Sequence, residues 1–113
     1  AELSRFIASI DGIPHVKDIL SKQSIQFMTT EQPDHQYSIG WNYTPKSNRP
    51  WIRTGSLAGT SALVLKYPDG QCWILITNTS TWKGHGFSND SMAFFEKLRE
   101  KYMANMPKKD LFI

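Results

Sequence analysis

The first thirty residues carry apolar side chains at helical spacing. Leu3, Phe6, Ile7 and Ile10 fall on one helical face, and Asp11-Gly12 follows as a stop signal. A second apolar group between residues 19 and 28 predicts another short helix, with Ser21 or Ser24 as its N-cap. Residues 1–30 are therefore expected to be helical.

Between residues 37 and 79 the pattern becomes that of β-strands. Four candidate strands lie in this stretch, at residues 37–43, 51–54, 61–67 and 72–77. The first shows aromatic and apolar residues at alternate positions, whereas residues 61–67 are apolar on both faces, as in a central strand. Pro68-Asp69-Gly70 predicts a tight turn between the last two. Because parallel crossovers need a dozen or more residues, connections this short predict an antiparallel sheet.

Residues 88–106 are predicted to form a C-terminal helix. Ser88-Asn89-Asp90 offers N-caps, the apolar stripe consists of Met92, Phe95, Leu98 and Tyr102, and Pro107 ends the helix. The expected fold is α+β: an antiparallel sheet of three to four strands packed against the C-terminal helix, with the N-terminal helices at one side. Residues 1–113 are read as one segment.

Composition narrows the classes of function. The chain has 113 residues, of which 40% are hydrophobic and 12% aromatic, and no run of about 18 apolar residues could span a membrane. The net charge of +3 comes from scattered Lys and Arg residues, and the Lys108-Lys109 pair has no interleaved aromatic residues, so nucleic-acid binding is not expected. Cys72 is the only cysteine and lies in an apolar strand, which favours an inert buried thiol.

Arg53-Thr54-Gly55-Ser56 is the candidate binding segment. A strand that presents a cation, a hydroxyl and a glycine lets a ligand approach the backbone closely. Arg53 and Thr54 could hold a carboxylate, and the amide of Ser56 remains available as a donor.

This segment and its surroundings resemble the C-terminal part of the β-lactamase-related family. The likeness runs from residues 37–41 through 53–60 to the strand ending near Asn78, and so covers most of the chain. The family includes class C β-lactamases, D-Ala-D-Ala carboxypeptidases and related esterases. Class A β-lactamases and penicillin-binding proteins combine S-x-x-K, S-D-N and K-T-G motifs, of which this chain has only the last, as Arg53-Thr54-Gly55.

The resemblance implies specific roles for these residues. Arg53, Thr54 and Gly55 would form the substrate-binding strand, and the Ser56 backbone amide would be the second oxyanion donor. The family more often has lysine or histidine at the position of Arg53, and arginine cannot carry a proton, so a proton-shuttle role is not expected. The partial fold would be of the β-lactamase/transpeptidase type.

Two other motifs imitate catalytic ones. Ser80-Thr81-Trp82-Lys83 fits S-x-x-K literally, but it follows the Arg53 motif and Gly84-His85-Gly86 would break the helix that the motif needs, so it is read as a decoy. Ser88-Asn89-Asp90 is read as a helix cap. His15, His35 and His85 lack the spacing of zinc ligands, and no metal or cofactor is expected.

The function expected from the resemblance is acyl-enzyme hydrolysis of a β-lactam, a D-Ala-D-Ala peptide or an ester by a longer parent protein, exported or periplasmic, with its serine upstream. This segment alone should not turn over substrate. The expected partners are the N-terminal remainder of the parent and a small-molecule or peptide substrate. Without that remainder, the edge of strand 72–77 should self-associate. The alternative is a non-catalytic binding or interaction domain built on the same sheet, and substrate identity stays open.

Overall fold

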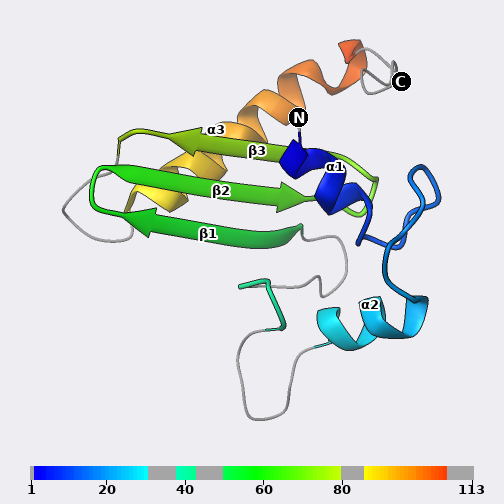
Figure 1. Cartoon of the computed structure of the whole chain (residues 1–113). Coiled ribbons are helices and arrows are strands. Elements are labelled where there is room, and N and C mark those ends of the chain that lie inside the picture. Colours follow the sequence, from blue (N-terminus) through cyan, green and yellow to red (C-terminus); the bar gives the residue numbers. More distant parts are fainter. Residues whose placement is uncertain (1, 31–37, 43–49, 80–85, 107–113) are drawn as a thin grey trace.

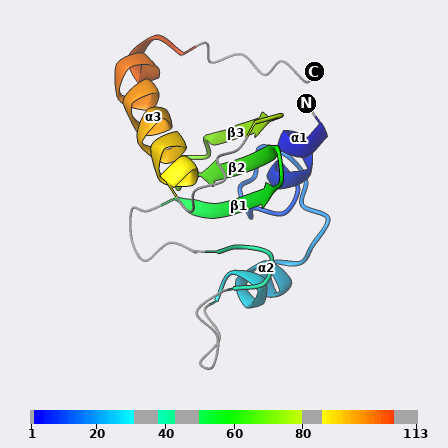
Figure 2. The same cartoon turned by 90° about the vertical axis from the view of Figure 1, so that its left-hand side faces the viewer.

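The computed structural model describes residues 2–30, 38–42, 50–79 and 86–106 (Figure 1). Its elements, in chain order, are α1 (Glu2–Ala8), α2 (Lys22–Thr29), β1 (Trp51–Leu57), β2 (Thr60–Lys66), β3 (Cys72–Thr77), α3 (Gly86–Tyr102) and a 3-10 turn, η1 (Met103–Asn105). The α+β class is confirmed. Figure 2 shows α3 on one face of the sheet and α1 on the other. None of the helices in these ranges has the length and apolar character needed to cross a membrane.

The three strands form an antiparallel sheet in the order β1-β2-β3. Gly59, with a φ of 78°, lies in the two-residue turn between β1 and β2, a conformation that favours glycine. The predicted Pro68-Asp69-Gly70 turn is present, and the Tyr67 N–H donates to the Gln71 carbonyl at 2.8 Å. β1 is longer than predicted, because it continues through Gly55 to Leu57 instead of ending at residue 54.

The face of the sheet toward α3 carries the larger core. Its buried members are Leu63, Leu65, Tyr67 and Phe95, and Ile52, Trp73, Leu75, Met92 and Leu98 pack around them. The rings of Trp73 and Phe95 lie 5.5 Å apart. Most of the predicted stripe on the C-terminal helix therefore contacts the sheet, whereas Tyr102 is exposed.

The opposite face holds a second core, made by Ile7, Trp41 and Val64. The rings of Trp41 and Trp51 meet edge to face at a centroid distance of 5.3 Å, which is a favourable aromatic geometry. Trp41, Trp51 and Trp73 thus serve in packing, as expected of tryptophans in predicted strands. Trp82 lies outside the described residues.

The predicted strand over residues 37–43 is wrong for the part that the structure describes. Residues 38–42 form a turn in which Ser38 and Trp41 make an isolated bridge, and Gly40 has a φ of 82°. A left-handed glycine interrupts the extended backbone, so the alternation of apolar residues does not produce a strand. Tyr37 and Tyr43 lie outside the described residues.

The predicted N-cap is confirmed for α2 and is wrong for α3. The Ser21 hydroxyl accepts from the Ser24 N–H at 3.1 Å and caps α2, as predicted. α3 already begins at Gly86, so Ser88-Asn89-Asp90 lies inside its first turns and the predicted capping role is wrong. The Ser91 hydroxyl bonds back to the Phe87 carbonyl at 2.7 Å.

A buried ion pair ties the segment after α1 to the β2–β3 hairpin. Lys66 Nζ lies 2.7 Å from Asp11 Oδ2, and the two side chains are only 5% and 3% exposed. Lys66 Nζ also donates to the Gly70 carbonyl at 2.7 Å, while Asp11 Oδ1 accepts from the Ile13 N–H at 2.8 Å. Both charges are therefore hydrogen-bonded beyond the pair, as buried charges require.

Candidate functional site

β1, the strand that carries the candidate binding segment, lies at one edge of the sheet. The Thr54 N–H donates to Asn42 Oδ1 at 2.8 Å, and the Asn42 N–H donates to the Ile52 carbonyl at 2.8 Å. The backbone groups of Ile52 and Thr54 therefore point away from β2. Because strand residues alternate in the direction of their backbone groups, the Ser56 N–H also points to this open edge.

The Ser56 amide therefore lies on the outer edge of β1. Ser56 is exposed. The side chain of Asn42 bonds to β1 at Thr54, two residues before Ser56. No hydrogen-bond partner of the Ser56 amide is found among the residues of known placement. The amide can donate to a ligand that lies along the edge.

The side chains of the segment divide between the two faces of the sheet. Ile52 packs into the core between the sheet and α3, and Trp51 packs into the core on the opposite face, where α1 lies. Because side chains alternate along a strand, Thr54 and Ser56 lie on the α3 side of the sheet. Arg53 and Gly55 lie on the α1 side. The Thr54 hydroxyl lies 3.3 Å from Asn42 Oδ1 and can donate to it. Arg53 and Thr54 are therefore brought to one edge, but their side chains do not converge on one point.

Packing gives no reason for a glycine at position 55. A Cβ atom built there would meet the Ala62 Cβ at 3.7 Å, an ordinary contact, and the φ angle of Gly55 is not in the left-handed region. Glycine in a strand interior lowers stability and often marks a close approach of another molecule. The bare backbone between Arg53 and Ser56 is the feature that a ligand would use.

Arg53 borders an apolar cavity of about 260 Å³ on the α1 side of the sheet. Its guanidinium-bearing side chain is exposed, and no carboxylate of the described ranges pairs with it. The cavity walls come from α1, α2, the 38–42 turn and β2. Sequence reasoning missed this cavity, because it depends on the turn that replaces the predicted strand.

Among the residues that the structure describes, the remaining candidate groups form no second site. Ser80-x-x-Lys83, His35 and His85 lie outside the described residues, and His15 is exposed. Within the ranges that the structure covers, no three His, Cys, Asp or Glu side chains could share a metal ion. Burial raises the pKa of the Cys72 thiol to about 11, so this thiol stays protonated at neutral pH and is a poor nucleophile.

Asn42 is the residue of this edge that sequence reasoning missed. It follows Trp41 in the predicted strand and offered no signal of its own, since its role depends on the 38–42 turn bringing its amide beside Thr54. Asn42 both donates to and accepts from β1 and so fixes the edge in place.

Comparisons with protein-family models, with curated proteins and with solved structures gave no match to this chain.

Proposed function

We propose that this chain is the C-terminal segment of a β-lactamase-related serine hydrolase, with β1 as the substrate-binding wall. The observation that carries the proposal is the Ser56 amide, which faces an open sheet edge next to Arg53 and a glycine that packing does not require. An amide in that place can stabilise the oxyanion of an acyl-transfer transition state. The nucleophilic serine and its lysine would come from the N-terminal remainder of the parent.

In this proposal each residue has a separate task. A substrate carbonyl lies along the edge of β1, and its oxygen accepts from the Ser56 N–H as the upstream serine attacks the carbon. Gly55 leaves room for the substrate backbone, and Arg53 holds a substrate carboxylate on the α1 side. Asn42 keeps the edge straight by bonding to Thr54 and Ile52. The substrate can be a β-lactam, a D-Ala-D-Ala peptide or an ester, because the choice depends on walls beyond this segment.

Exposed apolar side chains support a further partner surface on the N-terminal part. In the described part of the chain, Ile19 is 68% exposed and Phe27 63% exposed, and both lie near α2. Large apolar side chains with this degree of exposure are candidates for packing against another protein segment. The proposed occupant is the N-terminal remainder of the parent.

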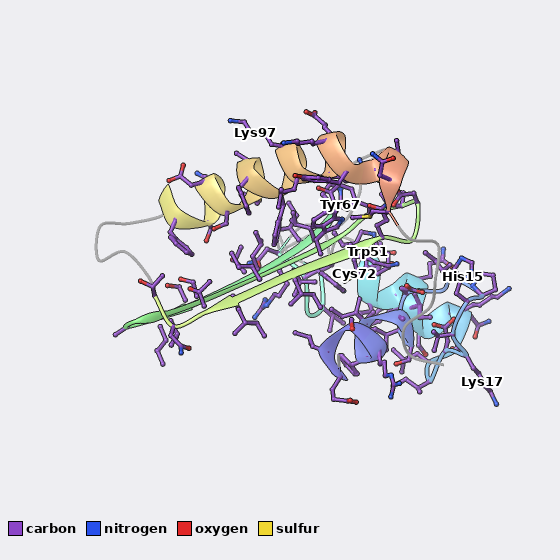
Figure 3. All side chains as sticks on the ribbon, turned by 90° about the horizontal axis from the view of Figure 1, so that it is seen from above. His15, Lys17, Trp51, Tyr67, Cys72 and Lys97 are labelled. Carbon is purple, nitrogen blue, oxygen red and sulfur yellow. The ribbon has the colours of Figure 1, made fainter. Side chains whose placement is uncertain are left out.

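The proposal predicts that Arg53→Ala in the parent protein selectively impairs substrates that carry a carboxylate. A charge-assisted contact contributes about 1.5 to 3 kcal/mol, so kcat/KM should fall about tenfold or more for these substrates and little for neutral esters. Steady-state kinetics on one substrate of each class measures the difference. Lys97→Ala, on the outward side of α3 (Figure 3), is the control and should change neither value. An equal loss on both substrates would mean that Arg53 is structural.

The other edge of the sheet is formed by β3, which we propose pairs with further strands of the parent. The Tyr67 N–H bonds to Gln71 across the turn, so alternation directs the backbone groups of Cys72, Ile74 and Ile76 away from β2. Seen from above in Figure 3, no described helix lies across this edge. β3 contains neither charge nor proline, which are common protections of a free edge.

The isolated chain is therefore expected to self-associate through β3, and Ile76→Lys should return it to a monomer. Ile76 is 68% exposed, so the substitution places a charge on the edge without emptying the core. Leu57→Lys, at a 76% exposed residue of β1, is the matched control and should leave association unchanged. Sedimentation velocity over a wide concentration range gives the answer, and a wild-type chain that stays monomeric throughout refutes edge pairing.

A further inference from the structure

The cavity beside Arg53 combines apolar walls with one charge. Its walls include Phe6, Ile7, Ile10, Met28, Trp41 and Val64. Of the described residues that line it, Arg53 is the only one with a charged side chain, and the others are apolar or glycine. Ligand sites in proteins commonly have this composition, with a mainly apolar lining and a few polar groups that orient the ligand.

The size and charge of the cavity restrict its occupant. A volume of about 260 Å³ lies just below the range of ligand pockets for drug-sized molecules, which begins at about 300 Å³. It accommodates a single aliphatic chain better than a multi-ring cofactor. A cationic ligand would be repelled by Arg53, and a neutral one would at most exchange a hydrogen bond with water at the exposed guanidinium, whereas a carboxylate matches the guanidinium in charge and in geometry.

The rim of the cavity supports the same class of ligand. Phe6 is 53% exposed and Ile39 51% exposed, so apolar surface is open to water around the entrance. An aliphatic chain that enters between these side chains would remove from water both its own apolar surface and that of the two side chains. Its charged end could stay at the exposed Arg53 and keep part of its hydration.

We propose that this cavity binds an aliphatic monocarboxylate of medium chain length, with the tail between α1 and α2 and the carboxylate on Arg53. The site is distinct from the Ser56 amide, which faces the edge of β1 while the cavity lies on the α1 face of the sheet. The inference goes beyond the proposed hydrolase function and does not rest on it, because binding here requires no nucleophile. A ligand of this class would also cover the exposed rim.

Isothermal titration calorimetry with octanoate and with 1-octanol, each below its aggregation limit, tests the proposal on the full chain. Wild-type protein should bind octanoate more tightly than octanol. Arg53→Met keeps the alkyl stem and removes the charge, so octanoate affinity should fall about tenfold to a hundredfold while octanol affinity stays unchanged. The indole N–H signal of Trp41 should shift in NMR spectra on titration, since this ring lines the cavity.

Two further variants separate this site from other surfaces. Met28→Trp fills the cavity from α2 and should abolish binding of both compounds, whereas Lys97→Met on α3 should alter neither. Equal affinity for octanoate and octanol in wild type, no binding of either, or octanoate binding that survives both Arg53→Met and Met28→Trp overturns the proposal. Loss of turnover in the parent has no bearing on these results, because the readout is binding.

Discussion

Asp11→Ala is expected to lower the free energy of unfolding by about 3 to 5 kcal/mol, because it leaves the Lys66 ammonium buried without its counter-charge. The Lys66 side chain is 5% exposed, and among the described residues the variant leaves it the Gly70 carbonyl as its hydrogen-bond partner. The Ile13 N–H also loses its acceptor. Urea denaturation followed by far-UV circular dichroism measures the loss.

Two matched variants distinguish the effect of breaking the ion pair from the general effect of removing a carboxylate. Asp90→Ala, at an exposed residue of α3, should stay within about 0.5 kcal/mol of wild type. The double variant Asp11→Leu with Lys66→Met replaces both charges by apolar groups and should recover most of the stability, since a buried pair often does no better than apolar residues of similar volume. A loss below about 1 kcal/mol in Asp11→Ala would show that water reaches the pair.

This ion pair matters for the proposed sites because it fixes the N-terminal segment against the sheet. Asp11 follows α1, and Lys66 ends the central strand β2. α1 in turn supplies Phe6, Ile7 and Ile10 to the cavity beside Arg53. Loss of the pair should therefore loosen the cavity before it affects the α3 face, whose core is separate.

Local signals in the sequence account for most of the fold. The β2–β3 hairpin was predictable because Pro68-Asp69-Gly70 stands between two apolar runs, and α2 because Ser21 is a good cap. The predicted strand at 37–43 failed in its described part because Gly40 adopts a positive φ, which a pattern of apolar residues does not reveal. β1 runs past its predicted end at residue 54 because Gly55 continues the extended backbone to Leu57.

The candidate edge was predicted only in part. The Arg53-Thr54-Gly55-Ser56 segment was predicted as the candidate from local pattern, although the outward direction of the Ser56 amide depends on a strand length and register that the sequence did not supply. Asn42, the Asp11–Lys66 pair and the cavity were not predicted, because each joins residues far apart in the chain. The sequence alone does not reveal that the lysine at the end of an apolar strand is buried and paired with an aspartate far away in the chain.

The measurement that tests the central claim most directly compares Ser56→Pro with Ser56→Ala in the parent protein. Proline removes the outward N–H, and an edge strand tolerates it where that N–H does not serve the sheet. Alanine keeps the N–H and removes only the side chain. If the Ser56 amide is an oxyanion donor, Ser56→Pro should lower kcat about 10²- to 10³-fold, or about 2.7 to 4 kcal/mol, while Ser56→Ala stays near wild type.

Thermal unfolding of both variants must show intact folding, and the acylation rate with a chromogenic ester or β-lactam then gives the result. We expect a folded Ser56→Pro protein that acylates slowly and a Ser56→Ala protein that acylates normally. A folded Ser56→Pro protein with wild-type acylation would contradict the claim that β1 supplies the oxyanion donor.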